Sequence, residues 1–291
     1  MWFINKKNIL SIKKNLKMKK NIQLLTAATA VAVLISVSSC KKKDDVTGTP
    51  AAATPTGTLA FHLHTNVDTN EVDTFGATYV LTGGRKITLN VAQCYVSNIM
   101  LVGVSGSMTA VPNVVKFKRQ QNEVYTIGSV PVGNYTSVMF DIGLGATANA
   151  TAPVTTDTIL YQPGMAAMGM IPAMPTTWFS NPWGASTGYI FLSLQGTIDT
   201  TTAGNGTNMI PFSYNIGTSA NSETITMPNQ NFSVTANQVT FVHMIIDYYK
   251  LFNGIKLNDP NNLQMNTTAD NTTALGIQLA HNIQSMVSYE Q

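Results

Sequence analysis

Two histidines one residue apart are the first feature of the chain that can do chemistry. His62 and His64 alternate with the apolar residues Leu59, Phe61 and Leu63. In a β-strand, residues two apart point to the same face, so both imidazoles are expected on one side. Imidazole is a common ligand of transition-metal ions. The pair predicts a metal site, and the alternative is two solvent-facing histidines on an edge strand.

A methionine-rich segment offers a second set of donors. Thioether sulfur is a soft ligand that suits Cu(I) and binds without losing a proton. Glycine and proline within the segment favour a loop, where exposed methionines would need a function. The alternative is an adaptable apolar plug packed against the fold. The four methionines lie in GMAAMGMIPAMP and are Met165, Met168, Met170 and Met174.

Aromatic side chains follow this segment closely. The stretch TWFSNPWGASTGY holds Trp178, Phe179, Trp183 and Tyr189. Aromatic residues at this density usually supply packing area. Exposed rings can also stack on a sugar, so the stretch leaves a glycan-binding surface open as an alternative to a metal site.

The N-terminal segment is typical of a secretory signal peptide. Basic residues up to Lys20 precede an apolar run over residues 22–37. The run is shorter than the roughly 20 apolar residues that a membrane span needs. We predict a signal peptide over residues 1–39, which a start at Met18 would give a conventional length. Its end, VSSC, fits the lipobox pattern in which the sulfur of Cys40 takes a diacylglycerol.

Acylation of Cys40 would attach the protein to a membrane. Acyl chains such as palmitate contribute about 0.8 kcal/mol per buried CH₂, and several chains make a stable anchor. The following KKKDD is similar to the start of lipoproteins from Bacteroidetes-type bacteria, and Lys after the Cys agrees with outer-membrane sorting. Residues 40–58 are polar, contain proline and predict a flexible tether. We expect an outer-membrane lipoprotein that faces the periplasm or the medium.

Charge and motif content exclude several classes of function. From Lys41 onward the chain has 10 basic and 14 acidic residues, so a nucleic-acid partner is not expected. No nucleophile elbow, zinc-protease motif, CxxC or phosphate-binding loop is present, and we expect no enzymatic activity. Because Cys40 is expected to be acylated, Cys94 has no disulfide partner within the chain.

The body of the chain predicts a single all-β domain over residues 59–291. Short runs of alternating apolar residues are separated by Gly, Asn, Asp and Pro, which favours a β-sandwich, immunoglobulin-like in general architecture. A short C-terminal helix is expected within residues 269–287, with Leu275, Ile277, Leu279, Ile283 and Met286 as its apolar stripe. The predicted strands include 59–64, 86–91, 95–104, 111–117, 138–142, 188–195 and 239–249.

Seven segments, in this order, resemble the MbnP-like copper-binding protein family. The resemblance runs from about Leu59 to Met286. The segments are LAFHLHTNV (59–67), CYVSNIMLV (94–102), SVPVGNYTSVMFDIG (129–143), WGASTGYIFLSLQG (183–196), FSYNIG (212–217), IIDYYKLFNG (245–254) and LAHNIQSM (279–286).

The resemblance implies a secreted or outer-membrane-associated protein that binds copper through histidine. In some members a tryptophan that a di-haem partner enzyme oxidises to kynurenine joins the site. The matching positions here are His62 or His64 on the first strand, and Trp183 for the first Trp of the family's WxW motif.

The chain departs from the family pattern at four positions. Ala185 replaces the second Trp of WxW, Asn215 the His of "yHiG", and Gln195 the Glu of "klEG". Gly145 replaces an acid after "GiG". These departures leave two readings open: a changed ligand set that includes methionine, or loss of the metal.

We therefore expect copper binding, preferably of Cu(I), by His62 and His64 with the four methionines as further donors. The alternative is a surface module that binds a glycan or a protein on the same sandwich fold, which Asn215 and Ala185 favour. His243 and His281 match no motif and are expected to be a strand residue and a helix-surface residue.

Overall fold

Two β-sheets make up most of the described part of the chain. The computed structural model describes residues 53–112, 115–118, 122–151, 159 and 188–290. The residues from Thr54 onward form one compact unit. Within the described ranges, no helix is long and apolar enough to cross a membrane. The predicted all-β fold with a short C-terminal helix is confirmed.

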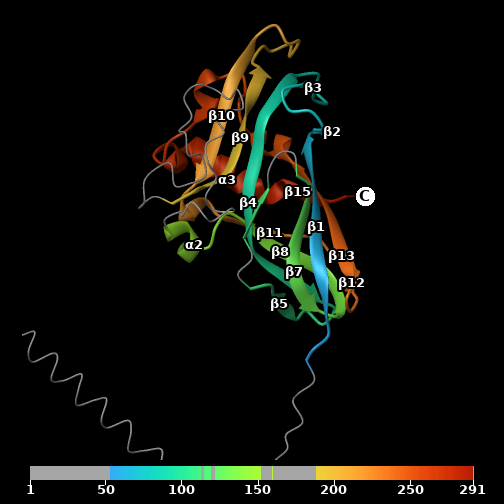
Figure 1. Cartoon of the computed structure of the whole chain (residues 1–291). Helices are drawn as coiled ribbons and strands as arrows, with labels where there is room; N and C mark the ends of the chain where they lie inside the picture. Colours follow the sequence, from blue (N-terminus) through green and yellow to red (C-terminus); the bar gives the residue numbers. More distant parts are fainter. Residues whose placement is uncertain (1–52, 113–114, 119–121, 152–158, 160–187, 291) are drawn as a thin grey trace, which may run out of the picture. The chain divides into compact units, whose positions relative to one another are not determined.

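The smaller sheet has five strands. They are β1 (Thr56–Val67), β2 (Asn70–Glu71), β7 (Val124–Pro131), β13 (Val239–Asp247) and β15 (Val287–Tyr289). Their order is β15-β13-β1-β2, and β7 also pairs with β1. β1 and β13 run parallel and lie side by side (Figure 1). β1 is therefore an interior strand, with neighbours on both sides.

The larger sheet has ten strands arranged around one long strand, β4 (Lys86–Gly103). The others are β3 (Thr78–Val80), β5 (Met108–Ala110), β6 (Val115–Lys118), β8 (Gly133–Ile142), β9 (Ile190–Asp199), β10 (Met209–Gly217), β11 (Glu223–Thr226), β12 (Phe232–Val234) and β14 (Gln264–Met265). The path β11-β8-β4-β9-β10-β14 runs across the sheet, with β3, β5 and β6 on β4 and β12 on β8.

β4 differs from the prediction of two strands over 86–91 and 95–104. The pairing of β4 shifts register between Leu89 and Val91 and again between Ser97 and Met100. Asn98 has a φ of 51° at the second shift. Such bulges reset the inside–outside alternation, so one continuous strand has the sequence pattern of two.

The hydrophobic core lies between the two sheets. Leu59, Phe61 and Leu63 of β1 are buried in it, and the ring centroids of Phe61 and Phe140 on β8 are 5.8 Å apart. Cys94 is a free, buried thiol in the same core. Because the odd-numbered residues of β1 fill the core, the even-numbered ones face away from the larger sheet.

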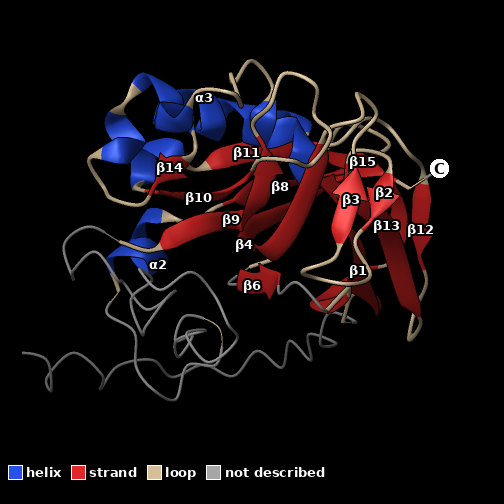
Figure 2. Ribbon diagram, turned by 90° about the horizontal axis from the view of Figure 1, so that it is seen from above, coloured by secondary structure: helices blue, strands red, loops and turns tan. Residues whose placement is uncertain are grey.

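The C-terminal helix α3 (Ala274–Asn282) is shorter than the predicted range. Thr273 begins it by accepting a hydrogen bond from the backbone N–H of Gly276. Leu279 and Ile283 are buried as predicted, but Ile277 is 58% exposed, because it lies on the solvent side of the helix. α3 contacts β10, and Figure 2 shows it on the side of the unit away from β1 and β13.

The other helical segments among the described residues are short. They are α2 (Ala146–Ala150) and five 3-10 turns at Ser219–Asn221, Tyr248–Phe252, Pro260–Asn262, Asp270–Thr272 and Ile283–Ser285.

Candidate metal centre

Three histidines and three glutamates meet on the outer face of the smaller sheet. His62 and His64 come from β1, and His243 is the direct register partner of His62 on β13. The carboxylates come from strand ends: Glu71 from β2, Glu123 just before β7, and Glu290 just after β15. Each strand of this sheet, or the residue next to its end, therefore places a side chain at the site. We call these six residues the histidine cluster.

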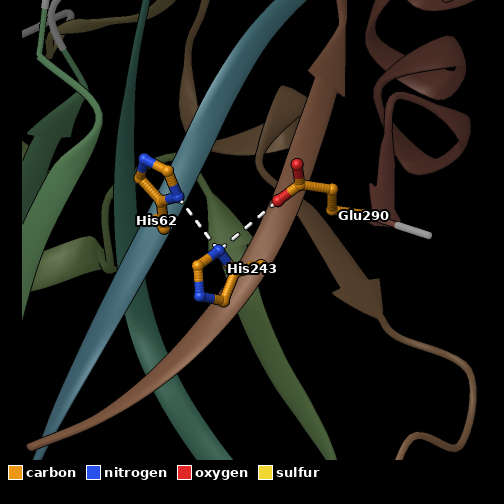
Figure 3. Close-up of side chains that lie close together, drawn as sticks. All are labelled: His62, His243 and Glu290. Carbon is orange, nitrogen blue, oxygen red and sulfur yellow. Dashed lines mark hydrogen bonds and ion pairs between the residues drawn. The ribbon is translucent and has the colours of Figure 1, made fainter.

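His243 and Glu290 lie on one side of the His62 ring (Figure 3). The Nδ1 atoms of His62 and His243 are 3.0 Å apart, and the two rings are perpendicular. The Nδ1 atom of His243 is also 3.4 Å from Oε2 of Glu290. The backbone N–H of Glu290 donates to the carbonyl of His243, which fixes the end of β15 beside this ring.

His64 and Glu123 lie near the other nitrogen of His62. Nε2 of His62 is 3.4 Å from Oε2 of Glu123. The ring centroids of His62 and His64 are 4.2 Å apart, which places both imidazoles on one face of β1 as the alternation predicted. Nδ1 of His64 is 3.8 Å from Oε1 of Glu123 and 2.7 Å from Oε1 of Glu71. Its Nε2 is 3.5 Å from Glu290.

The histidine cluster is partly shielded from water and rich in negative charge. The side chains of His64, His62 and His243 are 16%, 22% and 51% exposed. Among the described residues, every ion pair of the three carboxylates is with one of these histidines. Lys118 acts on Glu123 only as a longer-range charge. Among the residues that the structure describes, no Lys or Arg is therefore in direct contact with these carboxylates.

The spacing of the donor atoms fits a metal ion. Two ligands bound at about 2.0 Å from one ion are separated by roughly 3 to 4 Å. Ligand atoms of His62, His243 and Glu290 lie within 4.8 Å of one another, and so do those of His62, His64 and Glu123. Imidazole and carboxylate are both ordinary ligands of first-row transition metals. The donor types and their spacing therefore fit such an ion.

Comparison with known proteins places the chain in a family. The family model MbnP matches residues 56–268. The chain belongs to the MbnP family. The solved structure of MbnP from Methylosinus trichosporium is similar to this chain with a TM-score of 0.38 and 14% sequence identity, covering 68% of this chain and 78% of that chain. No curated protein matches the chain.

Asn215 and Gln195 are two of the four departures from the MbnP pattern. Both lie on the outer side of the larger sheet, away from the histidine cluster. Tyr214 and Ile216 of β10 are in the core, so Asn215 between them points away from the smaller sheet. Asn215 accepts a hydrogen bond from Ser193 and donates to Asn266. Gln195, which is fully buried on β9, alternates in the same way with the core residue Leu194.

The histidine cluster and these departures are therefore separated by the core. Asn215 and Gln195 cannot share an ion with His62, since each set lies on the outer side of its own sheet. Gly145 precedes α2 on the larger sheet's side of the unit and is also no part of the cluster.

Several predicted site residues lie outside the described residues. They are the lipidation site Cys40, the aromatic residues Trp178 and Trp183, the departure Ala185, and the four methionines Met165, Met168, Met170 and Met174. Their predicted roles stay predictions.

Four members of the cluster were not predicted from the sequence: His243, Glu71, Glu123 and Glu290. His243 was expected only as a strand residue. Its alternation with the buried residues Val242 and Met244 places it on the outer face of β13. That pattern was visible in the sequence, but the pairing of β13 with β1 was not. His281 is exposed on α3, as predicted.

Proposed function

We propose that the protein binds copper at the histidine cluster. The observation that carries this proposal is the convergence of three imidazoles from two parallel strands, with the Nδ1 atoms of His62 and His243 3.0 Å apart. A family of copper-binding proteins is what the sequence motifs imply. We infer a binding protein and not an enzyme, since no catalytic motif is present in the sequence.

The donors of the cluster favour Cu(II) over the Cu(I) expected from the sequence. Carboxylates are hard ligands, and a mixed nitrogen and oxygen set suits Cu(II), whereas Cu(I) prefers sulfur. Cu(II) also exceeds Zn²⁺ in the usual order of affinity for such ligands. If the four methionines bind copper, they form a separate Cu(I) site or become ligands at the histidine cluster when its copper is reduced to Cu(I).

Copper titration of the purified protein tests the proposal. After removal of metal with a chelator, the wild type is expected to bind Cu(II) more tightly than Zn²⁺. The double variant His62→Ala/His64→Ala is expected to lose this binding. His281→Ala is the matched control, because it removes an exposed histidine that is not part of the histidine cluster. This variant is expected to bind Cu(II) as the wild type does. Equal copper binding by the double variant and the wild type would refute the proposed site.

The methionine segment is tested separately with Cu(I). Replacing Met165, Met168, Met170 and Met174 by Leu removes the thioethers and keeps the apolar volume. We expect lower Cu(I) affinity with unchanged Cu(II) affinity. Unchanged Cu(I) affinity would show that these methionines are not donors.

We also propose a lipid anchor at Cys40 and a location at the outer membrane. The support is the lipobox and the Lys residues that follow it. Cys40→Ser is expected to move the protein from the membrane fraction to the soluble fraction and to abolish palmitate labelling. Cys94→Ser is the matched control, because Cys94 is buried in the core. Labelling that survives in Cys40→Ser would contradict the anchor.

Two further expectations stay predictions. One is the di-haem enzyme as a partner that oxidises Trp183. The other is the alternative of a glycan-binding or protein-binding surface module without a metal, which predicts that the copper titration shows no binding.

A further inference from the structure

We propose that His62 serves two metal ions at once, one on each nitrogen of its ring, and that the histidine cluster is a dinuclear site. This inference rests on the proposed function, since it concerns the same residues. It goes further because it assigns a second ion and a bridging role to one residue. Two ligand groups that share only His62 carry the argument.

The first ion lies on the Nδ1 side of His62. Nδ1 of His62 is 3.0 Å from Nδ1 of His243, which is 3.4 Å from Oε2 of Glu290. Figure 3 shows these three side chains with one nitrogen of His62 facing His243 and the other on the far edge of the ring. This side therefore supplies two nitrogens and one oxygen, which leaves room for a water or a fourth ligand.

The second ion lies on the Nε2 side. Nε2 of His62 is 3.4 Å from Glu123, whose other oxygen is 3.8 Å from Nδ1 of His64. The third carboxylate, Glu71, is 2.7 Å from the same nitrogen of His64 and is a further oxygen donor. Nε2 of His64 faces Glu290 at 3.5 Å. A carboxylate there would orient the ring of a metal-bound histidine.

One ion cannot use both groups. The two nitrogens of an imidazole point to opposite edges of the ring, and ions bound at about 2.0 Å on each would lie about 6 Å apart. A single ion would therefore leave the ligands on the other edge of His62 unused.

Charge balance also favours two ions. Three carboxylates carry three negative charges, and one Cu²⁺ would leave the cluster with a net negative charge. When both nitrogens of His62 bind metal, the ring releases its remaining N–H proton to solvent and becomes a bridging imidazolate. The three carboxylates and the imidazolate then carry four negative charges, which equal the four positive charges of two divalent cations.

Metal analysis of the purified protein after equilibrium dialysis against excess Cu(II) tests the proposal. Two bound ions per chain support it. One bound ion per chain would contradict the proposal of a second ion and leave the proposed function intact. No bound ion overturns both. His281→Ala is the control and must keep the wild-type number.

Variants separate the two halves. His243→Ala is expected to lose the ion on the Nδ1 side and His64→Ala the ion on the Nε2 side, so each keeps one. His62→Ala is expected to lose both at a copper concentration that saturates the wild type. These side chains lie on the outer face, so each variant is expected to fold, and circular dichroism is the check on folding. If His62→Ala loses only one ion, the proposal that His62 binds both ions is wrong.

Electron paramagnetic resonance gives an independent readout of the bridge. Two Cu(II) ions joined by one imidazolate couple magnetically, so the fully loaded wild type is expected to give much less signal than two isolated ions. A full signal for two independent spins would overturn the bridge.

Discussion

The Nδ1 atoms of His62 and His243 lie 3.0 Å apart although the residues are separated by 181 positions in the chain. They are direct register partners on the parallel strands β1 and β13. A parallel pair needs a long connection between its strands, and here that connection is most of the domain, from residue 68 to residue 238. The histidine cluster therefore exists only when the domain is folded.

Copper is expected to stabilise the fold for this reason. A ligand that binds only the folded state at 100 times its dissociation constant adds about 2.7 kcal/mol. For a domain of this size the melting temperature would rise by roughly 5 to 10 °C. Thermal unfolding with and without Cu(II) measures the shift.

The variants decide whether this stabilisation comes from the cluster. His62→Ala/His64→Ala should show no shift with Cu(II), and His281→Ala should show the wild-type shift. A shift of equal size in the double variant would mean that copper stabilises the protein from another site.

Phe61 is expected to be a main contributor to the contact between the sheets. Its ring is fully buried and packs on Phe140 across the core. Phe61→Ala should lower the free energy of unfolding by about 3 to 5 kcal/mol through the cavity it leaves. Phe241→Ala is the control, since Phe241 is 45% exposed on the outer face and should cost about 0.5 kcal/mol or less. Urea denaturation of both variants measures the difference, and similar costs would contradict this packing.

Gly196 is expected to tolerate no side chain. A Cβ at Gly196 would lie 1.8 Å from the carbonyl oxygen of Thr88 on the neighbouring strand β4. Gly196→Ala should therefore destabilise the fold by about 1 to 3 kcal/mol, as overpacking does. Gly83→Ala is the matched control, because a Cβ at Gly83 meets nothing within 4 Å. A Gly196→Ala variant as stable as Gly83→Ala would show that the two strands are farther apart than described.

Lys118 is expected to give the stability a characteristic pH dependence. It is fully buried and donates to Oγ1 of Thr65 and to the carbonyl of Asn122. Burial lowers the pKa of Lys118 from 10.5 to about 8. Above pH 8 the unfolded chain holds this proton while the folded one loses it, so the Lys118 contribution to stability rises with pH.

Cys94 opposes the Lys118 effect above pH 9, so the rise in stability with pH is expected between pH 8 and 9. Burial raises the pKa of its thiol from 9.0 to about 11, so above pH 9 the unfolded chain loses a proton first and stability falls. Between pH 8 and 9, Lys118 is the only one of these two groups that changes the free energy of unfolding, which rises with pH. Lys118→Met should remove this rise in urea unfolding measured across that range. An unchanged slope in the variant would refute the assignment.

The fold class and one half of the site follow from local patterns. Period-two alternation around Phe61 is enough to place His62 and His64 together on one face. It is also enough to place Val242 and Met244 inside and His243 outside. Bulges hide the continuity of β4, because the shift at Asn98 resets the alternation on which the prediction relied.

The other half of the site depends on tertiary structure. Nothing local pairs β1 with β13, since their residues are brought together by the packing of the whole domain. Glu71, Glu123 and Glu290 lie at strand ends, where no periodic pattern marks an inward or outward position. Single exposed glutamates are common in any sequence, so only the three-dimensional arrangement marks these three.

The copper content of the protein isolated from its native cells is the most direct measurement of copper binding by the histidine cluster. We expect copper in the wild type and none in His62→Ala/His64→Ala/His243→Ala isolated in the same way, with His281→Ala retaining the wild-type amount. Equal copper in the triple variant and the wild type, or no copper in the wild type, would contradict this expectation.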